Sequence, residues 1–329
     1  MPNPFLGLGF NSWSTKYSRG SAAAQSFLQY TTTSSTSSFT LLSSGTVNYE
    51  VDWGDGTTES LTTNNPTHAY SSAGEYTIRI TPAEGSTYRP YFNTAASDTN
   101  IAAVAGTGGS QIGNTLYRAW YGASNMTSFG AIDTSSVTQN FTETWRDCSS
   151  LTSFPVIDTS NAGTFNSSWK NCTSLTSFPV LDFSSATALT SAWEDCTGLL
   201  SFPVIDPSNV TNFANAWDNC SSLTEFPALD FSSGTNFANA WNKCTSLTTF
   251  PANMFDNTGS IFQFNNAFAN TALTAQSIEN VLTSLDTNGA TGKNIRFSGT
   301  SAGKSTWSTA ANTAYDNLVA KSWTIYNNA

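Results

Sequence analysis

The sequence has little histidine, little charge and few basic residues. His68 is the only histidine in 329 residues, so a metal site built on several histidines is excluded and a Ser-His-Asp triad has one candidate base. Only 10% of the residues are charged, with 12 Lys and Arg against 22 Asp and Glu, which gives a formal net charge of -10. Since phosphate binding needs clustered Lys and Arg, no nucleic-acid partner is expected.

Long apolar runs are also missing. No stretch approaches the roughly 20 apolar residues of a membrane helix, so no membrane insertion is expected. The N-terminus lacks the basic start and apolar run of a secretory signal, while Ser, Thr and Asn fill the chain as on an extracellular surface. We therefore expect a virion surface protein, assembled in a host cytoplasm. An extracellular or bacterial cell-surface location, reached by another export route, is the alternative.

A 24-residue repeat occupies the middle of the chain. Tryptophan, cysteine, leucine and a Phe-Pro pair each recur at this interval. The tryptophan and cysteine ladders are Trp145, Trp169, Trp193, Trp217 and Trp241, and Cys148, Cys172, Cys196, Cys220 and Cys244. A repeat of this length indicates one coil of a solenoid, in which stacking buries the apolar face of each coil. We assign residues 119–270 to this solenoid.

Each coil is expected to contain a strand and a short helical segment. In "SLTSFPVID" apolar and polar residues alternate, which is typical of a half-buried strand, and stacked coils would form a parallel sheet. In "NFANAWDNC" Phe213, Trp217 and Cys220 have the i, i+4, i+7 spacing of one helical face. Both apolar faces are expected to point into one continuous core.

The two ladders have a structural and a functional interpretation. A row of tryptophans would suit carbohydrate stacking, but the apolar face that each Trp shares with its neighbours favours core packing. The five cysteines are an odd number, so they cannot all pair within the chain. Parallel side chains in a ladder also miss disulfide geometry, so buried free thiols are expected, as suits a reducing cytoplasm. No cofactor is expected.

A row of aspartates lies at the end of each predicted strand, each with a serine two positions later: Asp133, Asp158, Asp182, Asp206 and Asp230. Aspartate at such a place usually caps the following turn. Because stacked carboxylates repel one another, a calcium ion between some of them is a weaker hypothesis, with candidates Asp158, Asp182, Asp206 and Asp230. Paired carboxylates also serve glycosidases, but identical carboxylates in a repeat favour a scaffold over an acid and a base.

The repeat letters "NAWxNCxSLTxFPxxDxSxxTNF", clearest at 206–220, resemble the leucine-rich repeats of BspA-like surface proteins and of mycoplasma lipoproteins. This chain has Trp where that family usually has Phe, and Phe-Pro where it usually has Leu. The resemblance implies a surface adhesion scaffold and no enzymatic activity.

The segments "YEVDWGDGTTESL" and "PTHAYSSAGEYTIRITP" contain an Asp-Gly turn between alternating runs, which is a hairpin signal. Together they resemble a polycystic kidney disease (PKD) domain, which implies a β-sandwich over residues 36–92. His68 occupies the motif's histidine and is expected to fix the loop, and Asp52 and Asp55 are expected to form turns.

The remaining segments are assigned from their patterns. Residues 1–35 are assigned to a docking arm for a neighbouring virion protein, with the apolar residues Phe5, Leu6, Leu8, Phe10 and Trp13, and packing of this segment on the chain's own body is the alternative. Residues 93–118 are a linker and N-terminal cap of the solenoid. Residues 271–329 are an α/β C-terminal cap, with helix, strand, helix and strand in that order.

The predicted fold is therefore mainly β with short helices: an N-terminal PKD-like β-sandwich, a leucine-rich-repeat-like solenoid of 24-residue coils and a C-terminal cap. The predicted function is that of a non-enzymatic structural or adhesion protein on a bacteriophage virion, as a fibre, tail or decoration component. It would be present in many copies and bind a host-surface glycan or protein, or a neighbouring virion protein. A bacterial cell-surface adhesin is the alternative, and a polysaccharide-degrading enzyme the third hypothesis.

Overall fold

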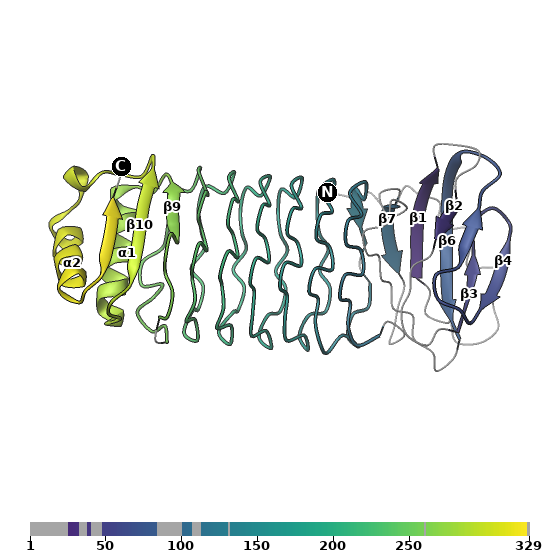
Figure 1. The fold of residues 1–329 in the computed structure, drawn as a ribbon, viewed down its shortest axis with the longest axis horizontal. Coiled ribbons are helices and arrows are strands. Elements are labelled where there is room, and N and C mark those ends of the chain that lie inside the picture. Colours follow the sequence, from purple (N-terminus) through teal and green to yellow (C-terminus); the bar gives the residue numbers. More distant parts are fainter. Residues whose placement is uncertain are drawn as a thin grey trace.

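The computed structural model describes residues 26–32, 38–40, 48–83, 101–106, 113–130, 132–259 and 261–327. They form a long body with strands at one end, a row of similar turns of chain in the middle and helices at the other end (Figure 1). The fold is mainly β with two short α-helices, as predicted. The apolar residues of the predicted docking arm, at positions 5, 6, 8, 10 and 13, lie outside the described residues.

Two sheets form the N-terminal end. The larger has the order β4-β3-β6-β1-β7-β8 and the smaller pairs β2 with β5. The strands are β1 (Ser26–Thr32), β2 (Ser38–Thr40), β3 (Tyr49–Asp52), β4 (Thr58–Leu61), β5 (Thr67–Ala69), β6 (Gly74–Pro82), β7 (Ile101–Gly106) and β8 (Ser128–Phe129). Every pairing is antiparallel except that of β7 with β8.

Two predicted boundaries change. Strand β1, which the sequence placed in the arm of residues 1–35, pairs with β6 over its whole length and with β7 on its other side. Strand β7, which the sequence placed in the linker of residues 93–118, pairs with β1 and β8. The larger sheet therefore continues from the N-terminal module to the first repeat coil. Neither strand has strict alternation in sequence, so its state depends on the strands beside it.

Backbone hydrogen bonds between residues about 24 positions apart join the repeat coils. The Thr211 amide donates to the Thr187 carbonyl at 3.0 Å, and the Thr235 amide donates to the Thr211 carbonyl at 2.9 Å. On another side of the coil the direction reverses, and the Trp217 amide donates forward to the Ala240 carbonyl at 2.9 Å. Successive coils thus lie side by side along the body (Figure 1).

Regular strands do not form where "SLTSFPVID" predicted them. Adjacent coils are joined there by isolated parallel bridges, such as Ser177 with Ser201 and Glu225 with Thr249. A proline in each Phe-Pro pair has no amide hydrogen to donate, which interrupts the ladder at that point. The apolar residues Leu175, Phe178 and Leu181 are buried, but they recur at every third position instead of every second, and Val180 is exposed, so the predicted alternation is wrong.

The helical turn predicted for "NFANAWDNC" is also wrong. The Ala216 and Cys220 amides donate to carbonyls three residues earlier, at 3.0 and 3.1 Å. The amides of Asn215, Trp217 and Asn219 instead donate to the next coil, at 2.9, 2.9 and 2.7 Å. A helix would direct all of these donors back into the same segment.

Left-handed residues cause this departure from a helix. Two occur in each coil, four positions apart: Glu143 and Asp147, Ser167 and Asn171, Ser191 and Asp195, Asn215 and Asn219, Asn239 and Lys243. Their φ values lie between 55 and 64°. Asn and Asp accept this conformation more readily than most residues, which explains why they recur there. The helix-like i, i+4, i+7 spacing of the buried residues is compatible with both conformations.

The core is a set of parallel aromatic stacks. From Trp120 to Trp241 each indole stacks on the next, with centroids 5.3 to 5.8 Å apart and planes within 16°. The rings of Phe154, Phe178 and Phe202 form a second stack with centroids 5.9 Å apart. Edge contacts join the stacks, as between Trp169 and Phe178 at 4.8 Å. Such pairs contribute roughly 0.5–1.5 kcal/mol each beyond area burial.

The C-terminal cap covers the last coil and has the predicted order of elements. After β9 (Phe268–Thr271) come α1 (Ala275–Asn288), β10 (Asn294–Gly299), the 3-10 turn η4 (Lys304–Thr306), α2 (Thr309–Ala320) and β11 (Thr324–Asn327). The three strands form a parallel sheet in the order β11-β10-β9. The Thr274 side chain caps α1 by accepting from the Ser277 amide, and left-handed Gly289 ends it. Within the described residues, no helix is long and apolar enough to cross a membrane.

We predict that Asn215→Gly will be more stable than Asn215→Ala by about 1 kcal/mol, because only alanine has a Cβ that disfavours φ near 56°. Both variants lose the bond from the Asn239 side-chain amide to the Asn215 oxygen, at 3.0 Å, so their difference isolates the backbone term. Urea unfolding of the two proteins measures it. A helical segment would give the opposite order, alanine above glycine, and that result would contradict the left-handed turn.

Candidate binding surface

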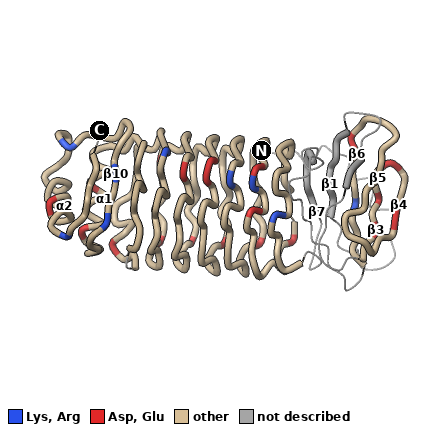
Figure 2. Tube along the Cα trace, in the orientation of Figure 1, with Lys and Arg blue, Asp and Glu red and all other residues tan. Residues whose placement is uncertain are grey.

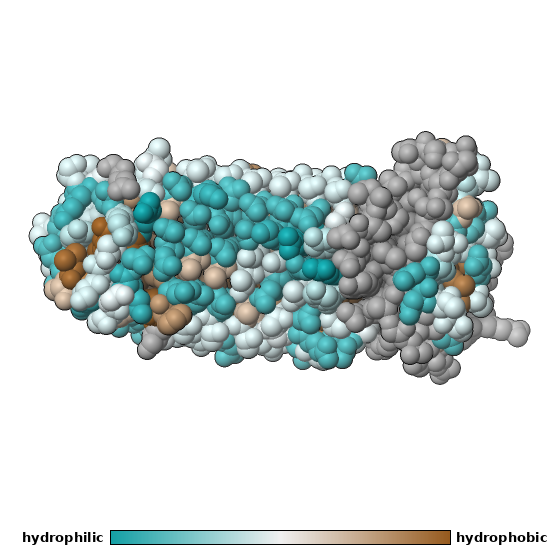
Figure 3. Space-filling view, in the orientation of Figure 1, coloured by the Kyte–Doolittle hydropathy of each residue, from teal (hydrophilic) through white to brown (hydrophobic). Residues whose placement is uncertain are grey.

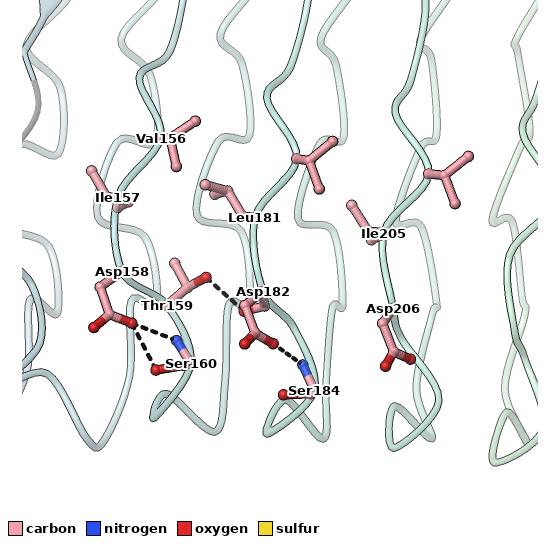
Figure 4. Close-up of a pocket in the computed structure, with 12 residues that line it drawn as sticks. Val156, Ile157, Asp158, Thr159, Ser160, Leu181, Asp182, Ser184, Ile205 and Asp206 are labelled. Atoms are coloured by element: carbon pink, nitrogen blue, oxygen red, sulfur yellow. Dashed lines mark hydrogen bonds between the residues drawn. The ribbon is translucent and has the colours of Figure 1, made fainter.

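A shallow groove crosses three successive coils and is the candidate functional site (Figure 4). Its hollow measures about 720 Å³. Each coil contributes the same three consecutive positions, a valine, an isoleucine or leucine, and an aspartate: Val156, Ile157 and Asp158; Val180, Leu181 and Asp182; Val204, Ile205 and Asp206.

The apolar part of the groove follows from the local chain direction. Ile157, Leu181 and Ile205 are buried in the core, and the valine before each of them therefore points outward. These valines, Val156, Val180 and Val204, are 66%, 62% and 63% exposed. A proline precedes every one of them and restricts the backbone. The result is a row of exposed apolar side chains, one in each of three successive coils.

The aspartate row runs beside the valines and forms the turns that its sequence position predicted. The Asp158 Oδ1 accepts from the Ser160 amide at 3.0 Å and from the Ser160 hydroxyl at 2.7 Å. Asp182, Asp206 and Asp230 each accept the amide of the residue two positions later, at 2.8, 3.0 and 2.8 Å. Hydrogen bonds from Ser184 lower the pKa of Asp182. Each carboxylate is therefore fixed in place by its own turn.

Adjacent turns are also tied together. The Thr159 hydroxyl is buried and donates to the Asp182 carbonyl of the next coil at 2.6 Å, and the Thr134 hydroxyl makes the same kind of bond to the Asp158 carbonyl at 2.5 Å. Figure 4 shows the first of these bonds as a dashed line from Thr159 to the next coil at Asp182. The spacing of the carboxylates is thus set by the stacking of the coils.

The calcium candidates Asp158, Asp182, Asp206 and Asp230 remain one per coil. Across the part of the chain that the structure describes, no group of three or more His, Cys, Asp and Glu side chains is arranged to hold a metal ion. Each of the four carboxylates uses one oxygen in its own turn. The arrangement therefore presents a row of single carboxylates instead of a convergent ligand set.

The tryptophan and cysteine ladders lie inside the coils. All ten side chains of the two ladders are 0% exposed, so none of these indoles offers a face to a carbohydrate. The five cysteines are free, and each thiol donates to the carbonyl of the tryptophan in the preceding coil, as Cys220 does to Trp193 at 3.2 Å. Burial raises the pKa of the Cys220 thiol, which keeps it in the unreactive neutral form.

A second polar row follows the left-handed residues on another side of the coils. Side-chain amides of Asn219 and Asn242 donate to Asp195 and Asp218 at 2.9 and 3.0 Å. Burial raises the pKa of Asp218 to about 6, with nearby Glu194 and Asp195 acting in the same direction and Lys243 opposing them. The sequence did not single out this carboxylate, because its position in the repeat is occupied by Arg146, Lys170, Glu194 and Asn242 in other coils.

The charged residues of the coils are divided between these two rows. Residues 114–270 contain 12 acidic and four basic side chains. Three basic residues of the second row form ion pairs there: Arg118 and Arg146 with Glu143, and Lys170 with Glu194. Within the described ranges, none of the groove aspartates from 158 to 230 forms an ion pair. Figure 2 shows how sparse the basic residues are along the coils.

In the N-terminal module His68 holds a loop. Its Nε2 lies 2.7 Å from the Asp55 Oδ2, and its ring stacks on the buried Trp53 at 4.8 Å. Burial works against ionisation of Asp55, but hydrogen bonds from Thr57 and His68 outweigh it and lower its pKa to about 2. Asp52 accepts the Gly54 amide at 2.9 Å. Both carboxylates thus form the turn of "WGDGT", as the sequence predicted.

This Trp-Gly-Asp-Gly turn, its stacked histidine and the strands around it were compared with known families. Residues 21–88 match the PKD domain family. The N-terminal module is therefore PKD-like, and it begins earlier than the predicted residue 36, so that β1 belongs to it. Comparison with curated proteins and with solved structures finds no match.

We predict that Asp218→Asn stabilises the protein by about 1 kcal/mol near pH 7.5, after allowance for the partial exposure of this group. The folded pKa of about 6 exceeds the ordinary value of 3.8, so the folded state of the native protein loses stability as pH rises between these values. Asparagine removes that loss, and Asn242 shows that the fold accepts it one coil later.

The measurement is urea unfolding of both proteins from about pH 2.5, which lies below the ordinary pKa of 3.8, to pH 7.5. The difference should vanish near the acid end, where Asp218 is protonated in both states. Glu225→Gln, on an exposed part of another side of the coil, is the control and should show no such dependence. A stability difference independent of pH would contradict the assignment of the buried carboxylate.

Proposed function

We propose that this chain is a non-enzymatic adhesion protein of a bacteriophage virion surface. Its repeat region would be a leucine-rich-repeat-type solenoid of 24-residue coils that presents the groove to a host surface or a neighbouring virion protein. The PKD-like module would serve as a spacer at one end, and the segment before it as an attachment to other virion proteins.

The observation that carries this proposal is the identity of the exposed positions in successive coils. Val156, Val180 and Val204 repeat the same apolar contact, and one fixed carboxylate accompanies each of them. Weak contacts repeated along a rigid body, and again over many copies, add up to a useful avidity. The tightly packed aromatic interior supplies the rigidity that such a surface needs.

The same observation supports binding over catalysis. A glycosidase needs an acid and a base whose environments differ. Asp158, Asp182 and Asp206 occupy equivalent turns, each accepting an amide hydrogen from the residue two positions later. Asp218 does differ, but it lies outside the groove and its oxygen is engaged by Asn242.

The free thiols support a setting in which the chain folds without disulfide formation. Five buried cysteines satisfy their S–H groups with backbone carbonyls and form no bridge. Folding in a reducing cytoplasm before release in a particle suits this chemistry. A bacterial cell-surface adhesin with the same coils is the second setting.

Antibody labelling of this chain, viewed by electron microscopy, tests the proposal on phage particles and on the surface of the cells that encode it. We expect label at regular positions on the particles. Label on the cells alone would support the cell-surface adhesin instead. Label on neither, or glycan cleavage by the purified protein that Asp182→Asn abolishes, would contradict an adhesion role.

A further inference from the structure

We propose that the Val-Asp groove binds an amphipathic α-helix carrying one basic and one apolar side chain per turn, contributed by a partner protein. The inference deepens the proposed adhesion function and rests on it. It is carried by the chemistry of the groove, by its charge and by the spacing of its coils.

The chemistry of the groove has two parallel components. The valine row is exposed and has no covering element in the described structure, since Val156, Val180 and Val204 are each more than 60% exposed. The face shown in Figure 3 is by contrast mainly hydrophilic over the coils, and its hydrophobic residues gather over the C-terminal cap.

The charge of the groove selects a basic partner. In the turns of Asp158, Asp182 and Asp206 the Oδ1 atom accepts the local hydrogen bond, which leaves Oδ2 for a partner. The four basic residues of the repeat coils lie on the side of the left-handed residues, and none of them pairs with these carboxylates. A row of like charges with no counter-charge favours a ligand that brings a cation to each position.

The spacing of the coils selects a helix. Adjacent coils are joined by backbone hydrogen bonds and parallel bridges, such as Ser177 with Ser201, and chains paired in this way lie about 4.8 Å apart. An α-helix repeats one face about every 5.4 Å, whereas alternate residues of an extended strand repeat roughly every 6.4–6.8 Å and a polyproline turn about every 9.3 Å. The helix is the nearest of these to the coil spacing, and across the three coils of the groove its turns drift by only about 1.2 Å, so each turn would meet one Val-Asp pair.

This arrangement corresponds to the helix-in-groove mode of recognition, with anchors at i, i+3, i+4 and i+7. Lysine or arginine at one of these positions would reach a carboxylate, and leucine or alanine beside it would lie on a valine. A second copy of this chain fits poorly as the occupant, because its formal net charge is -10. The partner is therefore expected to be basic on the docking face.

The test uses a synthetic helical peptide of about 20 residues, with lysine and leucine placed once per turn on one face. A peptide of the same composition with its periodicity scrambled is the charge-matched control. Binding to the full chain is measured by calorimetry at low and at physiological salt. We expect the patterned peptide to bind more tightly than the scrambled one by about tenfold.

Protein variants locate the site. The triple variant Asp158→Asn, Asp182→Asn and Asp206→Asn keeps the Oδ1 acceptor of each turn and removes the charge. Its affinity for the patterned peptide should fall about tenfold at low salt, with its melting temperature unchanged. The control Glu50→Gln, Glu75→Gln and Asp316→Asn removes as much charge from exposed sites elsewhere and should bind as the native chain does. Val180→Thr, of nearly the same shape, should weaken binding without changing its salt dependence.

Three outcomes would overturn the inference. They are equal binding of the scrambled peptide, an unchanged affinity of the triple variant, and binding of a cationic glucosamine oligomer in the groove where the peptide fails. Concentration-dependent self-association that the triple variant abolishes would make a second copy the occupant and would likewise overturn it. Because antibody labelling of particles does not depend on the groove, the adhesion proposal can fail or survive independently of these results.

Discussion

The pairing of backbone groups between coils is the constraint on which the rest of this structure depends. Buried amide and carbonyl groups need partners, and here most of them lie about 24 residues away. Two left-handed residues per coil make this possible, since they turn alternate amides out of the coil and toward the next one, as at Asn215 and Asn219. An ordinary helix in the same place would use those donors internally and leave adjacent coils unconnected.

The register of the backbone places like side chains on top of one another. The aromatic stacks and the thiol-to-carbonyl bonds result from this register. The same register leaves the indole N–H groups without hydrogen-bond acceptors, which lowers stability. Those of the stacked tryptophans from Trp120 to Trp241 are buried without an acceptor among the described residues. Each such donor costs roughly 1–3 kcal/mol. The offset and edge contacts around each indole, together with its buried area, must outweigh that cost, which explains why so large a ring is kept at every repeat.

The sequence predicted the interior better than the path of the backbone. The 24-residue interval identified the buried tryptophans and cysteines of the two ladders, and the WGDG turn identified the PKD-like module, because both depend on contacts that recur locally or at a fixed interval. The sequence pattern around Trp217 predicted a helix where the structure has a turn, because the buried positions alone do not report the sign of φ. The Asn and Asp at positions such as 171, 195 and 219 were the available signal.

Strand β1 was missed because its state depends on β6 and β7. The groove aspartates were predicted as turn formers, whereas Asp218 differs from its neighbours only through burial that no sequence pattern reveals.

The two sides of the coil differ in how much their residues vary from one coil to the next, and this difference indicates different roles. On the side of the left-handed residues, opposite charges and amides vary from coil to coil and satisfy one another, as Lys170 does with Glu194. On the groove side the outward residues are the same in three successive coils, a valine and an aspartate in each, although neither is needed to fill the core. An outward valine more than 60% exposed adds little to folding. Repetition of a residue without a packing role is the feature on which the proposed binding function of this surface rests.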